Sequence, residues 1–144
     1  TLVSAGRSPK HNRGAVNVPP YRASTIVQPN YAAFEAARQA RFEKDTVVYG
    51  RFGTPASQAF EEAVAAIEGA DRCVALSSGM AACATAILAV VEAGDHVLLP
   101  DNVYQPVRLF AGGFLKRFGV ESSFYDPKVG GSIRALLRPN TKLV

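Results

Sequence analysis

Apolar and polar residues alternate along the chain in blocks that predict helices separated by short strands. The best-marked helix covers residues 55–68. Thr54 can cap its first turn, Pro55 suits the first helical position, and Gly69 can end it. Apolar residues inside this segment recur at spacings of four and three, which is typical of a helix with one apolar stripe. The stripe consists of Phe60, Val64 and Ile67.

The remaining segments extend this alternation of helices and strands. Further helices are expected at residues 31–43, 79–93, 106 to 116 or 117, and 133–137, and strands at residues 73–76, 96–100, 121–125 and from 143 onward. Strands joined by helices of this length imply right-handed crossovers and a mainly parallel sheet, so the predicted fold class is α/β. Ligands bind at the carboxyl ends of such strands. Residues 77–79 and 101–104 each follow a predicted strand, and we expect them to lie near each other.

The composition is that of a globular protein, with 48% apolar and 19% charged residues. The longest apolar run, residues 80–91, is shorter than the ~20 residues that span a bilayer. We therefore expect this run to be a buried helix, no membrane partner, and a cytoplasmic location.

Cysteine and histidine usage argues against a disulfide framework and against a metal site. Cys73 and Cys83 are expected to be small buried hydrophobic residues on a strand and a helix. His11 and His96 have no second ligand at metal-binding spacing, so no metal is expected and neither histidine is assigned a catalytic role.

The net charge of +4 is unevenly distributed. Residues 1–51 contain eight Lys or Arg against three Asp or Glu, whereas residues 52–144 contain eight against nine. The positive residues of the first part occur one at a time among Pro, Ala and Tyr, without the dense run or the stacking aromatics of a nucleic-acid site, so nucleic-acid binding is not expected. A solvated arm and an arm that contacts another subunit both remain possible.

The segment Ser-Ser-Gly-Met-Ala-Ala at residues 77–82 joins a predicted strand to a predicted helix. In such a corner, unpaired N–H groups and the helix dipole converge on an anion. Gly79 would allow a ligand to approach the backbone closely. The spacing fits neither a dinucleotide motif nor a P-loop, which favours a smaller phosphate ligand. The alternative is a tight turn with no ligand.

Several segments, in this order, resemble the N-terminal part of the Cys/Met-metabolism family of pyridoxal-phosphate (PLP) enzymes. They are Thr-Leu-Val and Ala-Gly-Arg within residues 1–7, Tyr-Gly-Arg-Phe-Gly-Thr at 49–54, Ser-Ser-Gly-Met-Ala at 77–81, Ala-Gly-Asp-His-Val at 93–97, Asn-Val-Tyr-Gln-Pro at 102–106 and Arg-Pro-Asn-Thr-Lys at 138–142. The resemblance implies the large domain of a fold-type I PLP-dependent transferase, incomplete here because such enzymes are longer. Residues 1–51 would be an N-terminal arm that contacts another subunit, and residues 52–144 the start of the PLP-binding α/β domain.

The resemblance also implies roles for particular residues. Gly79 and Met80 would present backbone N–H groups to the PLP phosphate. Tyr104 matches the tyrosine that stacks on the ring and is the candidate catalytic residue, with a cover for the sheet edge as the alternative. Tyr49 and Arg51 match a Tyr-x-Arg pair that reaches into the phosphate site of the neighbouring subunit, which implies a homodimer at least and a homotetramer in the whole enzyme. The alternative for Arg51 is a solvated loop charge.

Two further segments resemble the carbon–sulfur β-lyases of the family more than its γ-synthases and γ-lyases: Tyr-Gln-Pro at 104–106 and Phe-Tyr-Asp-Pro at 124–127. The implied reaction cleaves cystathionine, or a related cysteine thioether, to homocysteine or another thiol, pyruvate and ammonia. Phe52 stands where some β-lyases have a second arginine, which puts the substrate range in question. A γ-enzyme of the same family, a non-catalytic phosphate-binding module and an interaction domain remain open.

The resemblance places three functional groups beyond residue 144: the Schiff-base lysine, the aspartate that pairs with the pyridine nitrogen, and the arginine that holds the substrate α-carboxylate. Lys116, Lys128 and Lys142 lack the sequence pattern around that lysine, and none of them is assigned its role. This chain by itself is therefore expected to be inactive.

Overall fold

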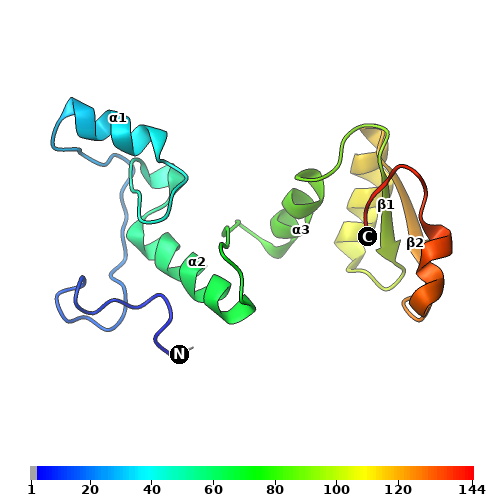
Figure 1. Ribbon diagram of the computed structural model, residues 1–144, viewed down its shortest axis with the longest axis horizontal. Helices are drawn as coiled ribbons and strands as arrows, with labels where there is room; N and C mark the ends of the chain where they lie inside the picture. The colour runs from blue at the N-terminus through cyan, green and yellow to red at the C-terminus, as the bar shows by residue number, and fades with distance from the viewer. Residues whose placement is uncertain (1–2) are drawn as a thin grey trace. The chain divides into compact units, whose positions relative to one another are not determined.

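The computed structural model describes residues 3–144 and divides into two compact units, Thr1–Ala75 and Leu76–Val144 (Figure 1). Thr1 and Leu2, which open the first of the resembling segments, lie outside the described residues. The expected division of the whole enzyme between residues 51 and 52 stays a prediction. Among the described residues, no helix combines the length and the apolar character needed to cross a membrane.

The first unit is built from α1 (Tyr31–Gln39), the short 3-10 helix η1 (Gly50–Phe52) and α2 (Pro55–Glu68). The bounds and both ends of α2 are as the sequence predicts. Thr54 Oγ1 accepts from the Ser57 N–H at 3.4 Å, Ser57 Oγ accepts from the Thr54 N–H at 2.8 Å, and Gly69 ends the helix at φ +66°. Phe60 and Ile67 of the apolar stripe are 59% and 57% exposed, so this unit does not bury the stripe.

The helix predicted at residues 31–43 ends earlier, at Gln39. The carbonyl of Arg38, which would accept from the Phe42 N–H in a longer helix, accepts from the Arg41 side chain instead, at 3.1 Å. The Glu43 N–H then donates to the Ala40 carbonyl in a tighter turn. The side chain of Arg41 thus replaces the next backbone hydrogen bond, and the helix stops.

The second unit contains a three-stranded parallel sheet in the order β2-β1-β3. Its strands are β1 (His96–Pro100), β2 (Glu121–Tyr125) and β3 (Thr141–Leu143). The parallel pairing is confirmed, and β1 and β2 have the predicted bounds. β1 runs in continuous register with β2, from His96 beside Glu121 to Pro100 beside Tyr125, whereas its register with β3 shifts after His96.

Helices cover one face of this sheet and complete its core. α3 (Gly79–Leu88) contacts α4 (Gln105–Leu109), and α4 continues directly into the π-helix η2 (Phe110–Leu115), which contacts β2 (Figure 1). The buried core consists of Ile87, Val97, Leu99, Val107, Ala111, Leu115 and Val120. The helix predicted from residue 106 is therefore present, but it widens into a π-helix where Gly112 and Gly113 weaken the α-helical preference. The last helix, η3 (Gly130–Leu136), is a 3-10 helix that starts before the predicted residue 133.

The strand predicted at residues 73–76 is wrong, because the described residues form no strand there. A strand needs a hydrogen-bonding neighbour, and β1 is already paired on both sides. The Ala75 N–H donates instead to the Glu61 carboxylate, at 2.8 Å, and Val74 is 74% exposed. The apolar sequence favoured a strand, but in the described part of the chain residues 73–76 pair with no strand.

The expectation of a buried helix at residues 79–93 is also corrected. α3 ends at Leu88, and within it Ile87 alone is buried. The Val90 N–H bonds the Ile87 carbonyl in a tighter turn, and the Glu92 N–H bonds the Asp95 carboxylate. Cys83 is exposed and Cys73 only half-buried, so neither cysteine is buried as predicted. In the part of the chain that the structure describes, α4 packs on one side of α3 and leaves the rest of its apolar surface uncovered.

Candidate functional site

The loop at residues 101–104 leaves the carboxyl end of β1. The Asp101 N–H donates to the carbonyl of Tyr125, the last residue of β2, at 2.7 Å, and the Val103 N–H donates to Pro100 at 3.0 Å. Val103 packs against the core. The loop is thus tied to the ends of both neighbouring strands before it reaches Tyr104.

Tyr104 lies directly before α4 and is 63% exposed. Its carbonyl accepts from the N–H groups of Val107 and Arg108, at 2.9 and 3.2 Å. Within residues 3–144, its ring and hydroxyl make no hydrogen bond or ring contact. An aromatic face so exposed can stack on a flat ligand, and this role of Tyr104 stays a prediction.

The start of α3 presents backbone donors. Ser78 caps this helix, and its Oγ accepts from the Ala81 N–H at 3.1 Å. In the described part of the chain the N–H groups of Gly79 and Met80 have no acceptor, as expected for a first helical turn. No atom lies within 4 Å of where a Cβ on Gly79 would be. The turn alone therefore does not require glycine, and a bulky ligand could approach there. The preceding strand is absent, so this corner joins a loop, not a strand, to a helix.

The predicted phosphate-binding motif at residues 77–82 and the predicted ring-stacking motif at residues 101–104 both lie in the second unit. Met80, from the first, and Val103, beside Tyr104, both pack against the core cluster of the sheet. The helices that follow the motifs, α3 and α4, are in contact. The expectation that the two motifs are neighbours is therefore supported at the level of their helices.

Tyr49 and Arg51 lie in the first unit, on either side of Gly50. Tyr49 forms an isolated antiparallel bridge with Thr25, and its hydroxyl accepts from Ser24 Oγ at 3.0 Å. The Gly50 N–H donates to the Ser24 carbonyl at 2.7 Å. A Cβ atom at Gly50 would collide with the carbonyl oxygen of Ala23. The close approach of these two segments explains why glycine stands between the two predicted site residues.

Arg51 is exposed and lies over two aromatic rings. Its guanidinium carbon lies 5.0 Å from the ring centre of Phe52 and 5.8 Å from that of Tyr49. Among the described residues it has no carboxylate partner. Phe52 in turn meets Phe42 edge-on at 5.7 Å. Arg51 is thus a cation held on aromatic faces, with its N–H donors available to an anion.

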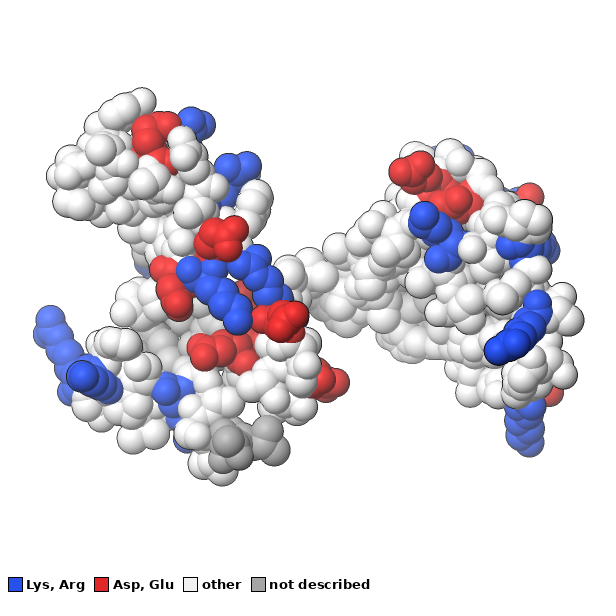
Figure 2. All heavy atoms as spheres, in the orientation of Figure 1, with Lys and Arg blue, Asp and Glu red and all other residues white. Residues whose placement is uncertain are grey.

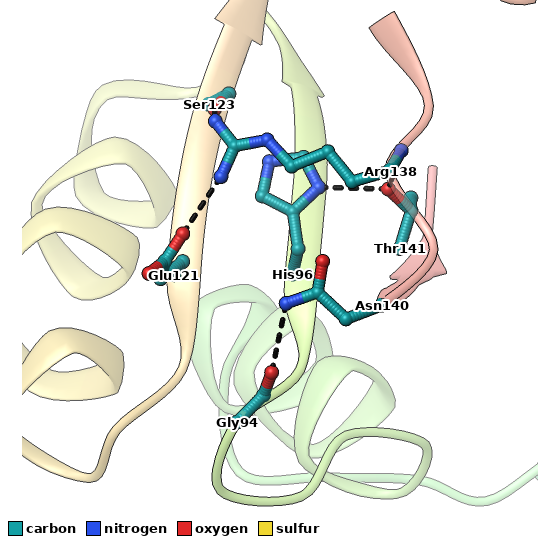
Figure 3. A network of polar contacts seen from close by, with 7 residues as sticks. All are labelled: Gly94, His96, Glu121, Ser123, Arg138, Asn140 and Thr141. Atoms are coloured by element: carbon teal, nitrogen blue, oxygen red, sulfur yellow. Dashed lines mark hydrogen bonds and ion pairs between the residues drawn. The ribbon is translucent and has the colours of Figure 1, made fainter.

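The amino end of the sheet holds a buried polar residue whose environment the sequence did not reveal. His96, the first residue of β1, is fully buried, and its Nδ1 lies 2.9 Å from Thr141 Oγ1 (Figure 3). Within the described chain its Nε2 has no partner. Burial lowers the pKa of His96, Arg138 lowers it further, and Glu121 opposes them. This histidine is therefore neutral at pH 7 and lies at the end of the strands opposite to Tyr104.

Arg108 is a second residue that the sequence did not single out. Its Nη1 donates to the Asp101 carboxylate at 2.6 Å and to the Asp101 carbonyl at 2.9 Å. Its guanidinium carbon lies 3.9 Å from the ring centre of Phe124. In the sequence, Asp101 offers an opposite charge seven positions before Arg108, with Tyr104 between them. That spacing alone could not show that the two side chains are in contact.

Charged groups do not gather into one patch on the face that Figure 2 draws, where Lys and Arg alternate with Asp and Glu over much of the first unit. Residues 3–144 contain no group of three His, Cys, Asp or Glu side chains arranged as metal ligands. The second unit thus presents the candidate backbone donors at α3 and the exposed ring of Tyr104, and the first unit presents the Tyr49–Arg51 pair; the roles of these residues stay predictions.

Comparison with known proteins places this chain among PLP enzymes. The family model described as Cys/Met metabolism PLP-dependent enzyme matches residues 1–144. The cystathionine β-lyase MetC of Escherichia coli strain K12 is 41% identical over 99% of this chain and 36% of its own length. The L-methionine γ-lyase of Treponema denticola is 35% identical over 99% of this chain and 35% of its own length.

Solved structures agree with the sequence comparison. The crystal structure of cystathionine γ-lyase from Lactobacillus plantarum, complexed with L-serine, matches 99% of this chain and 34% of its own chain, with a TM-score of 0.81 and 27% identity. The chain thus spans about a third of the length of the relatives it matches, and its sheet is part of a fold-type I PLP-enzyme fold. On the family match over its whole length, this chain belongs to the Cys/Met-metabolism family of enzymes, whose cofactor is pyridoxal 5'-phosphate.

Proposed function

We propose that the whole protein containing this chain is a carbon–sulfur lyase that cleaves cystathionine, or a related cysteine thioether, by β-elimination. The products are homocysteine or another thiol, pyruvate and ammonia. One observation carries the proposal: 41% identity, over 99% of this chain, to a relative named cystathionine β-lyase. The Tyr-Gln-Pro segment at 104–106 and the Phe-Tyr-Asp-Pro segment at 124–127 support the same branch.

The residues present fit the phosphate and the ring of PLP. A phosphate needs several N–H donors or a cation, and the first turn of α3 offers the N–H groups of Gly79 and Met80 without acceptors in the described chain. A pyridine ring needs a flat apolar face, and the Tyr104 ring is exposed. When bound, PLP supplies the electron sink that lets the α-proton be removed and the thiolate leave from Cβ.

Within this proposal each residue has one task. Gly79 and Met80 bind the phosphate, and the open space beside Gly79 admits it close to the backbone. Tyr104 holds the ring in orientation, and its hydroxyl assists at the reacting centre. The lysine that binds the cofactor covalently is assigned outside this chain, since Lys116, Lys128 and Lys142 lack the sequence pattern around that lysine.

Tyr49 and Arg51 are assigned to the phosphate site of a second copy of the protein. The guanidinium of Arg51 has aromatic neighbours but no carboxylate among the described residues, so its donors are free for a phosphate. A hydrogen bond of this charged kind is worth about 1.5–3 kcal/mol. A homodimer is then the minimal active unit. A homotetramer and a cytoplasmic location stay predictions.

The test is to identify the keto acid released by the complete protein. Cystathionine and S-alkyl cysteines are incubated with the PLP-loaded protein, and pyruvate and 2-oxobutyrate are separated by chromatography as their hydrazones. The same protein stripped of PLP, and then reloaded, serves as the control. We expect pyruvate from both substrate classes, with strong competition from S-alkyl cysteines because Phe52 replaces a second cationic side chain.

A γ-lyase is the second candidate, because the Treponema denticola relative named L-methionine γ-lyase is 35% identical over the same 99% of the chain. Dominant 2-oxobutyrate from cystathionine would move the protein to that branch. Release of no keto acid from any thioether would overturn the lyase proposal and favour a phosphate-binding protein without this activity.

A further inference from the structure

The guanidinium of Arg108 makes three contacts, two with Asp101 and one with Phe124. Its Nη1 donates both to the carboxylate and to the backbone carbonyl of Asp101, at 2.6 and 2.9 Å. Its guanidinium lies flat against Phe124 of β2, with 3.9 Å between its carbon and the ring centre. Arginine suits this position because its delocalised fork can stack and donate hydrogen bonds at once.

The side chain of Arg108 holds the start of the loop that carries Tyr104, and the backbone of Arg108 holds its end. The side chain of Arg108 binds Asp101, where the loop begins, and the backbone N–H of Arg108 donates to the carbonyl of Tyr104, where it ends. The Tyr104 side chain itself is 63% exposed and has no contact that fixes it within the described residues. The backbone of residues 101–104 therefore fixes the point at which the Tyr104 side chain leaves the loop, and Arg108 is the side chain that binds the first residue of this backbone.

The ion pair by itself adds little to the stability of the fold. The side chains of Arg108 and Asp101 are 36% and 61% exposed, and exposed ion pairs contribute weakly because water screens them. What the three contacts supply is geometry: they tie the first residue of the loop to β2 and α4, in addition to the backbone bonds of Asp101 and Val103. The loss of Arg108 should therefore loosen the loop without unfolding the unit.

We propose that Arg108 is a positioning residue for Tyr104, and that it keeps the loop backbone that carries the tyrosine ring in place beside the ligand on which the ring stacks. This inference rests on the proposed function, in which that ligand is PLP. Displacement of a catalytic group by about 1 Å can cost up to about a hundredfold in rate. A loosened loop should thus reduce turnover far more than it reduces substrate binding.

The test compares three variants of the complete protein. Arg108→Met removes all three contacts, and Arg108→Lys keeps a charge near Asp101 but loses the stacking fork. Arg138→Met is the matched control, because Arg138 makes a similar exposed ion pair, 2.7 Å from Glu121, at the opposite end of the strands. Each variant is measured for hydrogen exchange of the amides of residues 101–104, for the visible circular dichroism of bound PLP, and for kcat and KM.

For Arg108→Met we expect faster exchange in the loop, altered dichroism of the cofactor, and a fall in kcat of about ten- to a hundredfold, with KM changed by less than about threefold. Arg108→Lys should recover part of each change, and Arg138→Met should leave all of them as in the unmodified protein. Wild-type exchange and dichroism in Arg108→Met would overturn the inference. So would equal changes in Arg138→Met, which would indicate a general loss of stability.

Two further outcomes are distinguishable. If the unmodified protein binds no PLP, the proposed function fails, and loop exchange alone then decides whether Arg108 closes the loop. If Arg108→Met does not fold, Phe124→Leu keeps the ion pair and removes the ring beneath the guanidinium. We expect that variant to loosen the loop in the same direction by a smaller amount, and an unchanged loop would count against the inference.

Discussion

The two ends of the small parallel sheet have ion pairs of similar geometry but with different structural roles. At the carboxyl end Arg108 binds Asp101 at 2.6 Å, and at the amino end Arg138 binds Glu121 at 2.7 Å. All four side chains are partly exposed, so neither pair adds much stability by itself. The two ends differ in the residues that surround each arginine.

At the amino end Arg138 lies beside the buried His96 and residues that link it to the edge strand. Thr141 Oγ1 contacts His96 Nδ1 at 2.9 Å and accepts from the Arg138 N–H at 2.7 Å (Figure 3). Asn140 adds a bond from its side chain to the Gly94 carbonyl at 2.8 Å. This end attaches β3 to β1, whereas the carboxyl end orients an exposed loop. The same pair of charges therefore supports packing at one end and a candidate site at the other.

The most disruptive way to test this comparison is Thr141→Val. It removes the hydroxyl group shared by His96 and Arg138 and leaves a buried imidazole nitrogen and a backbone N–H without a partner. An unsatisfied buried polar group costs about 1–3 kcal/mol, so the free energy of unfolding in urea should fall by about that amount. Hydrogen exchange of residues 101–104 should not change.

The control for that substitution is Thr85→Val, which makes the same chemical change at an exposed position of α3. Its effect should stay within about 0.5 kcal/mol. Equal effects of the two substitutions would show that the hydroxyl of Thr141 has no special part at the amino end.

Acid should weaken the amino end before the carboxyl end, with a smaller effect than Thr141→Val because the contacts of His96 remain in place. The pKa of His96 lies below its ordinary value of 6.5 in the folded protein, through burial first and Arg138 second, with Glu121 opposing. Between the folded and the unfolded pKa the unfolded chain binds more protons, so stability is complete above about pH 6.5 and declines as the pH falls below it. Urea unfolding at pH 7.5 and pH 5.5 measures this decline.

The matched variant for the acid experiment is His96→Gln, which cannot take up a proton in this range. It should be less stable at both values but should lose less between them than the unmodified protein. An identical loss in both proteins would assign the acid sensitivity to other groups.

The smallest expected effects are those of the two arginines on global stability. Arg108→Met and Arg138→Met should each lower the free energy of unfolding by less than about 1 kcal/mol, and the loss should shrink in 1 M salt because exposed charges are screened. The variants should differ in acid sensitivity, since Arg138 lowers the pKa of His96. Between pH 7.5 and pH 5.5, Arg138→Met should lose slightly less unfolding free energy than the unmodified protein, and Arg108→Met should lose the same amount. The reverse order would contradict the comparison of the two ends.

Local signals predicted the elements whose ends depend on their own residues. α2 has the predicted bounds because its capping residues and Gly69 act within a few positions of the helix ends. β1 and β2 also have the predicted bounds, and each strand ends at or near a proline, Pro100 and Pro127. The family resemblance added the cofactor, which the match over residues 1–144 supports. The tasks of Tyr49, Arg51, Gly79, Met80 and Tyr104 stay predictions.

The sequence by itself thus determined the alternation of helices and strands, the parallel sheet and the family, because capping, periodicity and short motifs are properties of neighbouring residues. Tertiary structure decided which apolar segments find a partner. Residues 73–76 form no strand, and α3 buries Ile87 alone, because pairing and burial depend on distant parts of the chain. It also decided that Arg108 meets Asp101 and Phe124 while His96 is buried beside Thr141. Those residues are far apart in the sequence or follow no regular spacing, so no local sequence pattern shows that they are in contact.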